Sequence, residues 1–207
     1  MEEKIGYDLE MNIILSTRNP SKAEQIKAVF AGSPFTVLTL NDAGIEGEAT
    51  EDGMTLEENA LKKAEFAYKQ ASSKNWVMAD DTGIFIETLN GEPGIKSARW
   101  SGEHATSDEI LTYCLKRLEG KGNRMAYFET VVALISPQGE EYIFSGRVEG
   151  RLDEVPHCKP QPKMPYSAIF MPNGDTRVWA EMTVDEENKI SHRGKAFAKV
   201  KDFLLTL

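Results

Sequence analysis

Two groups of acidic residues have the composition of a site for a divalent cation. Asp80 and Asp81 follow a short apolar stretch, and Glu48, Glu51 and Asp52 lie in a polar loop upstream. Adjacent carboxylates at a strand end repel each other, whereas Mg²⁺ binds one or two carboxylates together with substrate phosphates. The aspartate pair is equally compatible with a metal site and with the start of a turn. The upstream group is more typical of a solvated loop.

A second candidate site lies between the first predicted strand and the first predicted helix. Residues 16–22, STRNPSK, combine hydroxyls, an amide and a lysine. The free backbone N–H groups at a helix N-terminus attract anions, so this composition suits a phosphate. The segment contains no glycine and is therefore unlike a glycine-rich P-loop. On composition alone, an ordinary loop explains it more often than a binding site does.

The third candidate is the run Ser191, His192 and Arg193. A planar guanidinium beside an imidazole suits recognition of a carbonyl-rich base or a phosphate. The spacing alone fits better with a helix-capping serine followed by two exposed residues. His157 and Cys158 lack a second pair of ligands at zinc-site spacing, and the sequence has no Gly-x-Ser-x-Gly elbow. Zinc chemistry and a serine nucleophile are therefore not expected.

The elements that must position these residues begin as an α/β domain. Apolar or alternating stretches predict strands over 11–16 and 35–40, with a helix over 22–30 between them. The order strand, loop, helix, strand is typical of α/β proteins. It places the hydroxyl-rich segment at a strand end and a helix start.

The elements around the aspartate pair come next. A capping box at 55–58 opens a helix that extends to about residue 71. Residues 76–79 predict a brief buried strand that delivers the two aspartates at its C-terminal end. We expect a turn at 82–83 and another strand over 84–86.

The C-terminal half continues the mixed pattern. A capping box at 106–109 opens a helix towards Leu118. Residues 125–136 and 141–148 predict a hairpin across Pro137-Gln138-Gly139. An apolar face predicts the last helix over 194–205.

Length and composition indicate one folded domain. The 207 residues are 41% hydrophobic and 28% charged, which excludes a disordered or low-complexity chain. We expect a single domain over 11–207, preceded by an N-terminal extension over 1–10. The net charge of −9 disfavours nucleic acid and anionic membranes as partners. A small anionic substrate remains compatible, because a pocket can be locally basic or bridged by a metal.

Targeting signals and cysteine usage predict a cytoplasmic protein. The acidic start MEEKIGYDLE lacks the basic and apolar regions of a signal peptide. No run approaches the roughly 18 apolar residues that span a bilayer. Two cysteines, Cys114 and Cys158, offer no disulfide framework, and Cys114 lies in an apolar helical pattern.

Four segments together resemble one known family. They are residues 16–30 (STRNPSKAEQIKAVF), 51–64 (EDGMTLEENALKKA), 79–102 (ADDTGIFIETLNGEPGIKSARWSG) and 180–197 (AEMTVDEENKISHRGKAF). The chain is similar through these segments to the inosine triphosphate pyrophosphatases, enzymes that act on ITP, dITP and XTP. The resemblance covers nearly the whole chain from Met11, and the Ala-Asp-Asp and Ser-His-Arg blocks are its most specific parts.

The resemblance implies a fold and a reaction. The fold would be α/β, an elongated mixed β-sheet flanked by helices, with two lobes and a cleft between them. The protein would assemble as a homodimer. The reaction would be hydrolysis of the bond between the α- and β-phosphates of a nucleoside triphosphate. Its products would be a nucleoside monophosphate and pyrophosphate, and its cofactor would be Mg²⁺.

The resemblance also assigns roles to matching positions. Asp81 would be the general base for the attacking water, Lys63 would bind the triphosphate, and Glu51 with Asp80 or Asp81 would hold Mg²⁺. Arg193 would donate to the 6-oxo group of the base. The residues that would contact the substrate are Thr17, Asn19, Lys22, Lys63, Thr82, Tyr166, Ser167, His192 and Arg193.

The region that would read the base departs from the family. Met164, Pro165 and Ser167 stand where the family has Phe, Gly and Asp, and Glu187 stands where it has Lys; Tyr166 is retained as an aromatic platform. We therefore expect ITP and XTP to be preferred over GTP by a smaller margin than is usual in the family. Two alternatives are the same reaction with a broadened or shifted base preference, and a nucleotide-binding protein with weak turnover. The retained catalytic residues argue against the second.

Overall fold

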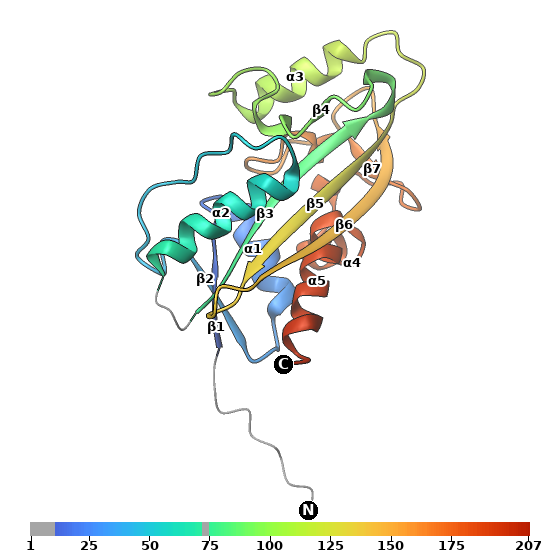
Figure 1. Cartoon of the computed structure of the whole chain (residues 1–207). Helices are drawn as coiled ribbons and strands as arrows, with labels where there is room; N and C mark the ends of the chain where they lie inside the picture. Colours follow the sequence, from blue (N-terminus) through green and yellow to red (C-terminus); the bar gives the residue numbers. More distant parts are fainter. Residues whose placement is uncertain (1–10, 72–74) are drawn as a thin grey trace, which may run out of the picture.

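One mixed β-sheet runs through the length of the molecule (Figure 1). The structure is a computed structural model that describes residues 11–71 and 75–207. β1 lies between β2 and β3 and is parallel to both, and the remaining pairings are antiparallel. The strands follow the order β2-β1-β3-β5-β6-β7, with β4 paired to β3. They are β1 (Met11–Leu15), β2 (Phe35–Thr39), β3 (Trp76–Ile86), β4 (Pro93–Gly94), β5 (Met125–Ile135), β6 (Glu141–Leu152) and β7 (Phe170–Pro172).

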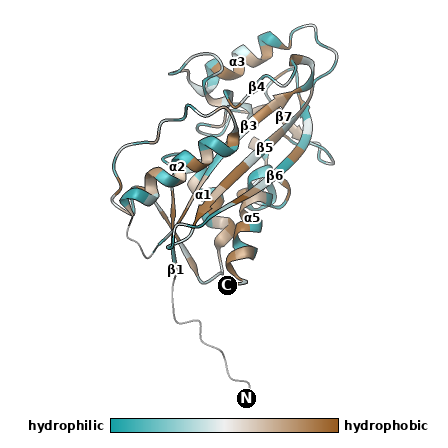
Figure 2. Cartoon of the chain, viewed as in Figure 1, coloured by the Kyte–Doolittle hydropathy of each residue, from teal (hydrophilic) through white to brown (hydrophobic). Residues whose placement is uncertain are grey.

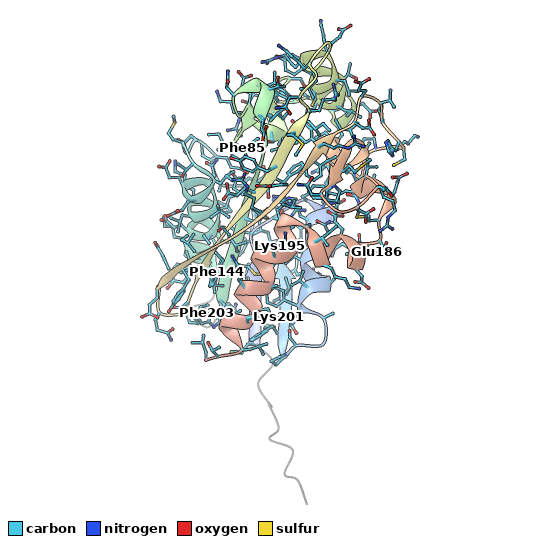
Figure 3. All side chains as sticks on the ribbon, turned by 90° about the vertical axis from the view of Figure 1, so that its right-hand side faces the viewer. Phe85, Phe144, Glu186, Lys195, Lys201 and Phe203 are labelled. Atoms are coloured by element: carbon cyan, nitrogen blue, oxygen red, sulfur yellow. The ribbon has the colours of Figure 1, made fainter. Side chains whose placement is uncertain are left out.

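Helices cover both faces of this sheet, as the expected α/β class requires. α2 packs on one face against β5, and α1 and α5 pack on the other (Figure 1). Figure 3 shows Phe203 of α5 near Phe144 of β6, with ring centroids 5.5 Å apart. The helices are α1 (Pro20–Phe30), α2 (Leu56–Gln70), α3 (Ser107–Arg117), α4 (Val184–Ile190) and α5 (His192–Leu204).

Apolar side chains gather in separate clusters at the two ends of the sheet. One cluster joins α1 and α5 to β1 and to the lower part of β5, where Phe197 and Leu134 are fully buried. Another joins α3, β7 and the upper parts of β3 and β5, around Phe128, Phe170 and Trp179. Figure 2 shows hydrophobic residues concentrated in the central strands. The expected two-lobed α/β architecture is thus confirmed.

The aspartate pair lies inside a strand, so the expected strand end and turn at 82–83 are wrong. β5 pairs with β3 without a break, from Val77 opposite Ile135 to Ile86 opposite Ala126. Gly83 serves close packing instead of a turn, because a Cβ there would lie 2.7 Å from the carbonyl oxygen of Gly94. β3 is therefore long enough to belong to both lobes.

Most other elements lie where the sequence placed them. The hairpin is confirmed, with β6 four residues longer than expected. The capping box of α3 is present, whereas in α2 Glu58 accepts from Met54 N and not from Thr55 N. α4 and β7 were not predicted, and the expected extension over 1–10 lies outside the described residues. Within residues 11–71 and 75–207, no helix is both long and apolar enough to cross a membrane.

The packing at Gly83 gives a stability prediction. Gly83→Ala should lower the free energy of unfolding by about 1–3 kcal/mol, because its Cβ would push β3 away from the Gly94 backbone. Gly122→Ala is the matched control, since no heavy atom lies within 4 Å of its added Cβ. Urea unfolding of the two variants measures the difference. Equal stabilities would show that the contact at Gly94 is not tight.

Candidate active site

One cleft of about 730 Å³ collects all the residues that the resemblance assigned to the site. They come from the loop after β1, the loop before α2, α1, α2, β3 and α5, and from the segment before β7. These lining residues are Thr17, Asn19, Lys22, Glu51, Lys63, Asp80, Asp81, Thr82, Tyr166, Ser167, His192 and Arg193. Residues far apart in the sequence therefore share one site.

The two aspartates reach this cleft from opposite faces of the sheet. Successive side chains of a strand point to opposite faces, so Asp80 faces α1 and α5 while Asp81 faces α2. β1 ends at Leu15, opposite Met78, two residues before Asp80. The pair therefore lies just beyond the end of β1, where a ligand can approach both faces.

On the α2 side, Lys63 links two carboxylates. Its Nζ lies 2.9 Å from Asp81 Oδ1 and 3.4 Å from Glu51 Oε2. Burial alone would lower the pKa of Lys63, but Asp81 and Glu51 raise it above its ordinary value. Asn59, fully buried, donates to Asp81 Oδ2 over 3.1 Å and accepts from Gly53 N. Asn59 thus fixes Asp81 and the start of α2 to the loop that carries Glu51.

On the other face, Asp80 is surrounded by cations. Lys22 Nζ lies 2.8 Å from Asp80 Oδ2, Arg193 Nε lies 3.7 Å from it, and Thr82 donates to it over 3.1 Å. Burial alone would raise the pKa of Asp80, but Lys22 and Arg193 hold it well below its ordinary value. Burial lowers the pKa of Lys22, and Asp80 only partly offsets this. The cleft therefore contains one buried cation, Arg193, and the half-buried Lys22, both close to the Asp80 carboxylate.

The loop between β1 and α1 contributes to the cleft through its cap. Asn19 Oδ1 accepts from Ser21 N and Lys22 N, and Asn19 N donates to Thr17 Oγ1. The cap starts α1 at Pro20, two residues earlier than expected. It also occupies backbone N–H groups that we expected to face an anion, so Lys22 is the principal positive group of this segment.

The start of α5 forms the second wall of the cleft. Ser191 caps the helix as expected, but His192 and Arg193 are 2% and 5% exposed, so the expectation that they face solvent is wrong. The His192 imidazole packs against both Phe128 and Trp179, with ring centroids 4.9 Å away in both cases, and these two rings lie 4.8 Å from each other. Burial lowers the pKa of His192 well below its ordinary value, so the imidazole is neutral at pH 7.

Several buried polar atoms of this wall have no hydrogen-bond partner among the described residues. They include Asp80 Oδ1, Arg193 Nε, His192 Nδ1 and Trp179 Nε1, and all four residues line the cleft. Buried polar atoms in folded proteins are nearly always paired. Their concentration here indicates a surface prepared for a polar ligand.

In the segment before β7, the Ser167 hydroxyl forms its hydrogen bonds with the backbone of the same segment. Ser167 Oγ donates to Met164 O over 2.7 Å and accepts from Gln161 N over 2.8 Å. Tyr166 is 4% exposed, donates to Ser97 O and packs edge-on against Phe128. Both residues line the cleft, but the Ser167 hydroxyl is directed into its own loop.

The sequence analysis missed four residues that line or support the cleft. Asn59 lies four positions before Lys63 on the buried face of α2, and a polar residue on an apolar helix face was the available signal. Gln25 accepts from Arg193 Nη1. Arg18 lines the cleft and ties its loop to Gly47 O and Ile45 O. Trp179 packs against His192, and nothing local in the sequence pointed to it.

The carboxylates on the α2 side suit a hard divalent cation. Oxygens of Glu51 and Asp81 both lie within 3.4 Å of one ammonium nitrogen, so one cation already bridges them. Two carboxylates with substrate phosphates are a common ligand set for Mg²⁺. In the part of the chain that the structure describes, no three His, Cys, Asp or Glu side chains gather at metal-binding spacing. Asp80 points to the other face, towards Lys22.

Comparisons with known proteins agree with the resemblance read from the sequence. The sequence model of the Ham1 family matches residues 13–203. A dITP/XTP pyrophosphatase of Caldanaerobacter subterraneus subsp. tengcongensis is 41% identical over 197 residues, which cover 94% of this chain and 96% of that protein. Another from Geobacter sulfurreducens is 38% identical, over 93% of this chain and 96% of that protein. The solved structure of a HAM1 protein from Coxiella burnetii has a TM-score of 0.81 and 30% identity, over 95% of this chain and 100% of that one.

The cations around Asp80 give a second prediction. In metal-free buffer at pH 7, Asp80→Asn should lower the free energy of unfolding by about 3–5 kcal/mol, because the buried Arg193 and the half-buried Lys22 lose their counter-charge. The native pKa of Asp80 is lowered. Its contribution is therefore complete above the ordinary aspartate pKa of about 3.9 and is lost as pH falls through the native pKa.

Urea unfolding between pH 3 and pH 8 tests this prediction. Asp52→Asn removes an exposed carboxylate that pairs with Lys62, and this control should change stability little. The stability difference between wild type and Asp80→Asn should stay constant from pH 8 to pH 5 and shrink only in more acidic buffer. A difference that disappears between pH 7 and pH 5 would contradict the ion-pair account.

Proposed function

The chain belongs to the Ham1 family, and we propose that it hydrolyses deaminated purine nucleoside triphosphates such as ITP, dITP and XTP to nucleoside monophosphates and pyrophosphate. Relatives of similar length carry the name dITP/XTP pyrophosphatase. The observation that carries the proposal is the bridge from Lys63 to Glu51 and Asp81, in the same cleft as Lys22 and the buried Arg193. This arrangement offers cations for phosphates and a carboxylate for water.

The phosphate end of the substrate would lie between α1 and α2. Each phosphate adds negative charge, which must be offset before water can approach. Lys22 and Lys63 supply two ammonium groups from opposite faces of the sheet. Thr17 and the Asn19 amide would donate from the loop after β1, and Thr82 would donate from β3.

Mg²⁺ is the cofactor that we propose for this end of the cleft. Glu51 and Asp81 would hold it, because their oxygens already converge on one cation, and Asp80 lies on the far face. When bound, the ion would neutralise phosphate charge and polarise the phosphate that water attacks.

Asp81 is the residue that we propose as general base. Oδ1 faces Glu51 and Lys63 and would be the oxygen towards the ion. Oδ2 accepts one hydrogen bond, from Asn59, and keeps a second lone pair that could take a proton. Lys63 contacts Oδ1, and its ammonium would turn to the phosphates of a bound substrate. The carboxylate can then accept the proton of an attacking water within hydrogen-bond reach.

The base end of the cleft would select purines that carry a 6-oxo group. Arg193 can only donate hydrogen bonds, so it suits the oxygen of hypoxanthine or xanthine. Adenine presents an amino group at that position, and a buried donor facing a donor costs about 1–3 kcal/mol. The neutral His192 and the ring of Tyr166 would complete this wall.

A panel of nucleoside triphosphates tests the function directly. The protein would be incubated with Mg²⁺ and ATP, GTP, ITP or XTP, and pyrophosphate and orthophosphate would be assayed separately. We expect pyrophosphate from ITP and little from ATP. Release of orthophosphate, or equal use of ATP and ITP, would overturn the proposal. Binding of ITP without turnover would instead favour the nucleotide-binding alternative.

A homodimer is part of the proposal. α2 covers the part of its sheet face that contains Val131 and Ala133. Beyond it on the same face, Phe85 stacks on Tyr127 at 4.8 Å, and the Arg147 guanidinium lies over Tyr127. The side chains of β6 on this face are exposed. Sedimentation equilibrium would measure the assembly, and a monomer at micromolar concentration would contradict it.

The assignment of Asp81 predicts a separation of chemistry from binding. Asp81→Asn should abolish turnover, because the amide keeps the shape of the side chain but cannot take a proton. Binding of ITP should remain measurable by calorimetry. Single-turnover kinetics decide the point, and a rate near that of wild type would rule out Asp81 as the base.

The assignment of Lys63 predicts a different defect. Lys63→Ala should raise KM for ITP and lower kcat, because a phosphate contact acts in the ground state and in the transition state. Lys62→Ala is the matched control: this neighbour on α2 is 43% exposed and pairs with Asp52. Steady-state kinetics compare the two variants. Identical behaviour would make Lys63 a residue of structural importance only.

A further inference from the structure

Glu187 is a buried acid that the proposed mechanism does not use. It lies in α4, lines the cleft and is 1% exposed. Burial raises its pKa, and the charge of Arg193 opposes this shift. Isolated carboxylates are rarely buried in folded proteins because desolvation is costly. Its position beside the base end of the cleft therefore needs an explanation.

Gln25 holds Arg193 against the helix that carries Glu187. The Gln25 side chain accepts from Arg193 Nη1 through Oε1. Asn188, which follows Glu187 in α4, donates to Gln25 O over 2.9 Å and fixes α1 to α4 at this point. The guanidinium donor of Arg193 and the carboxylate acceptor of Glu187 line the same cleft.

The residues that the structure describes give the Glu187 carboxylate a single hydrogen bond. Gln161 Nε2 lies 3.4 Å from Glu187 Oε2, at the limit of hydrogen-bond distance. The ionised form of Glu187, which the charge of Arg193 favours, accepts at two oxygens and about four lone-pair positions. It therefore retains capacity for donors on a bound base.

The order of donor and acceptor matches one edge of a purine. A 6-oxopurine presents an acceptor at O6 and a donor at N1, whereas adenine presents a donor at N6 and an acceptor at N1. Arg193 and Glu187 together complement the first edge and oppose the second. The three 6-oxopurines differ in the substituent at position 2, which lies next to N1. Hypoxanthine has a hydrogen there, guanine has an amino donor, and xanthine has an oxygen.

We propose that Glu187 is a specificity residue that accepts from N1–H of the base and disfavours an oxygen at position 2. This inference rests on the proposed function of the same cleft. Xanthine would bring its 2-oxo group against a carboxylate, and it is also the most acidic of these bases, so its anion is repelled. We therefore expect kcat/KM to be higher for ITP than for XTP, with XTP still a substrate. The amino group of guanine is accepted by the same carboxylate.

Ser167 does not provide this discrimination. Its hydroxyl is engaged with Met164 O and Gln161 N inside its own loop. Of the departures from the family, Glu187 is therefore the one that offers a polar group to the base, and it lines the same cleft as Arg193.

The experiment compares kcat/KM for ITP, XTP and GTP in wild type and Glu187→Gln. Glutamine keeps the shape, but its amide can donate to the 2-oxo group of xanthine and opposes the 2-amino group of guanine. We expect the XTP-to-ITP ratio to rise roughly 10-fold and the GTP-to-ITP ratio to fall, on the scale of one unpaired buried group. Asp185→Asn is the matched control, since it removes an exposed carboxylate from the same helix. Both of its ratios should equal those of wild type.

The outcomes separate this inference from the proposed function. If the wild-type protein has a kcat/KM for XTP equal to or above that for ITP, the inference is overturned. This result does not depend on whether Glu187→Gln folds. Ratios that move in the same direction, or do not move, in folded Glu187→Gln also overturn it. Absence of pyrophosphate from ITP and from XTP in wild type would instead overturn the proposed function.

Discussion

Alternation along a strand imposes the main constraint on this molecule. Asp80 and Asp81 are neighbours in β3, so their side chains leave the sheet on opposite faces and each needs its own cation. α1 supplies Lys22 to one face, and α2 supplies Lys63 to the other. The helices on the two faces therefore position one site together, and the early end of β1 lets both carboxylates reach it.

The same constraint explains how an acidic protein can bind an anionic substrate. The net charge is −9, yet Lys22 and Lys63 converge on the cleft, and Arg193 lies behind them at 5% exposure. Asp80, Asp81 and Glu51 lie against these cations and offset the cost of removing them from water. The proposed polyphosphate would offer negative oxygens to the same cations, so ion pairing positions the groups that a substrate would contact.

Local sequence signals predict most helices and strands correctly, but they do not predict which side chains a residue contacts in the fold. The capping box at Thr106 is predictable because its two partners, Thr106 and Glu109, lie three residues apart in the sequence. β3 was divided in error, since its continuity depends on pairing with β5, about 50 residues away. The burial of His192 followed from Phe128 and Trp179, which no pattern within α5 reveals. The family resemblance assigned these distant residues to one site, because members of a family share a fold and therefore share its long-range contacts.

The base wall shows the same limit at the level of chemistry. The sequence names position 167 among the departures from the family, but the structure shows that its hydroxyl hydrogen-bonds within its own loop. Glu187 departs as well, and its surroundings depend on Gln25 of α1, which binds Arg193 and the α4 residue Asn188. A side chain reads a base only when the fold leaves its donor or acceptor unpaired beside the ligand. We therefore expect base specificity in this cleft to depend on which polar groups the packing of α1 against α4 leaves available.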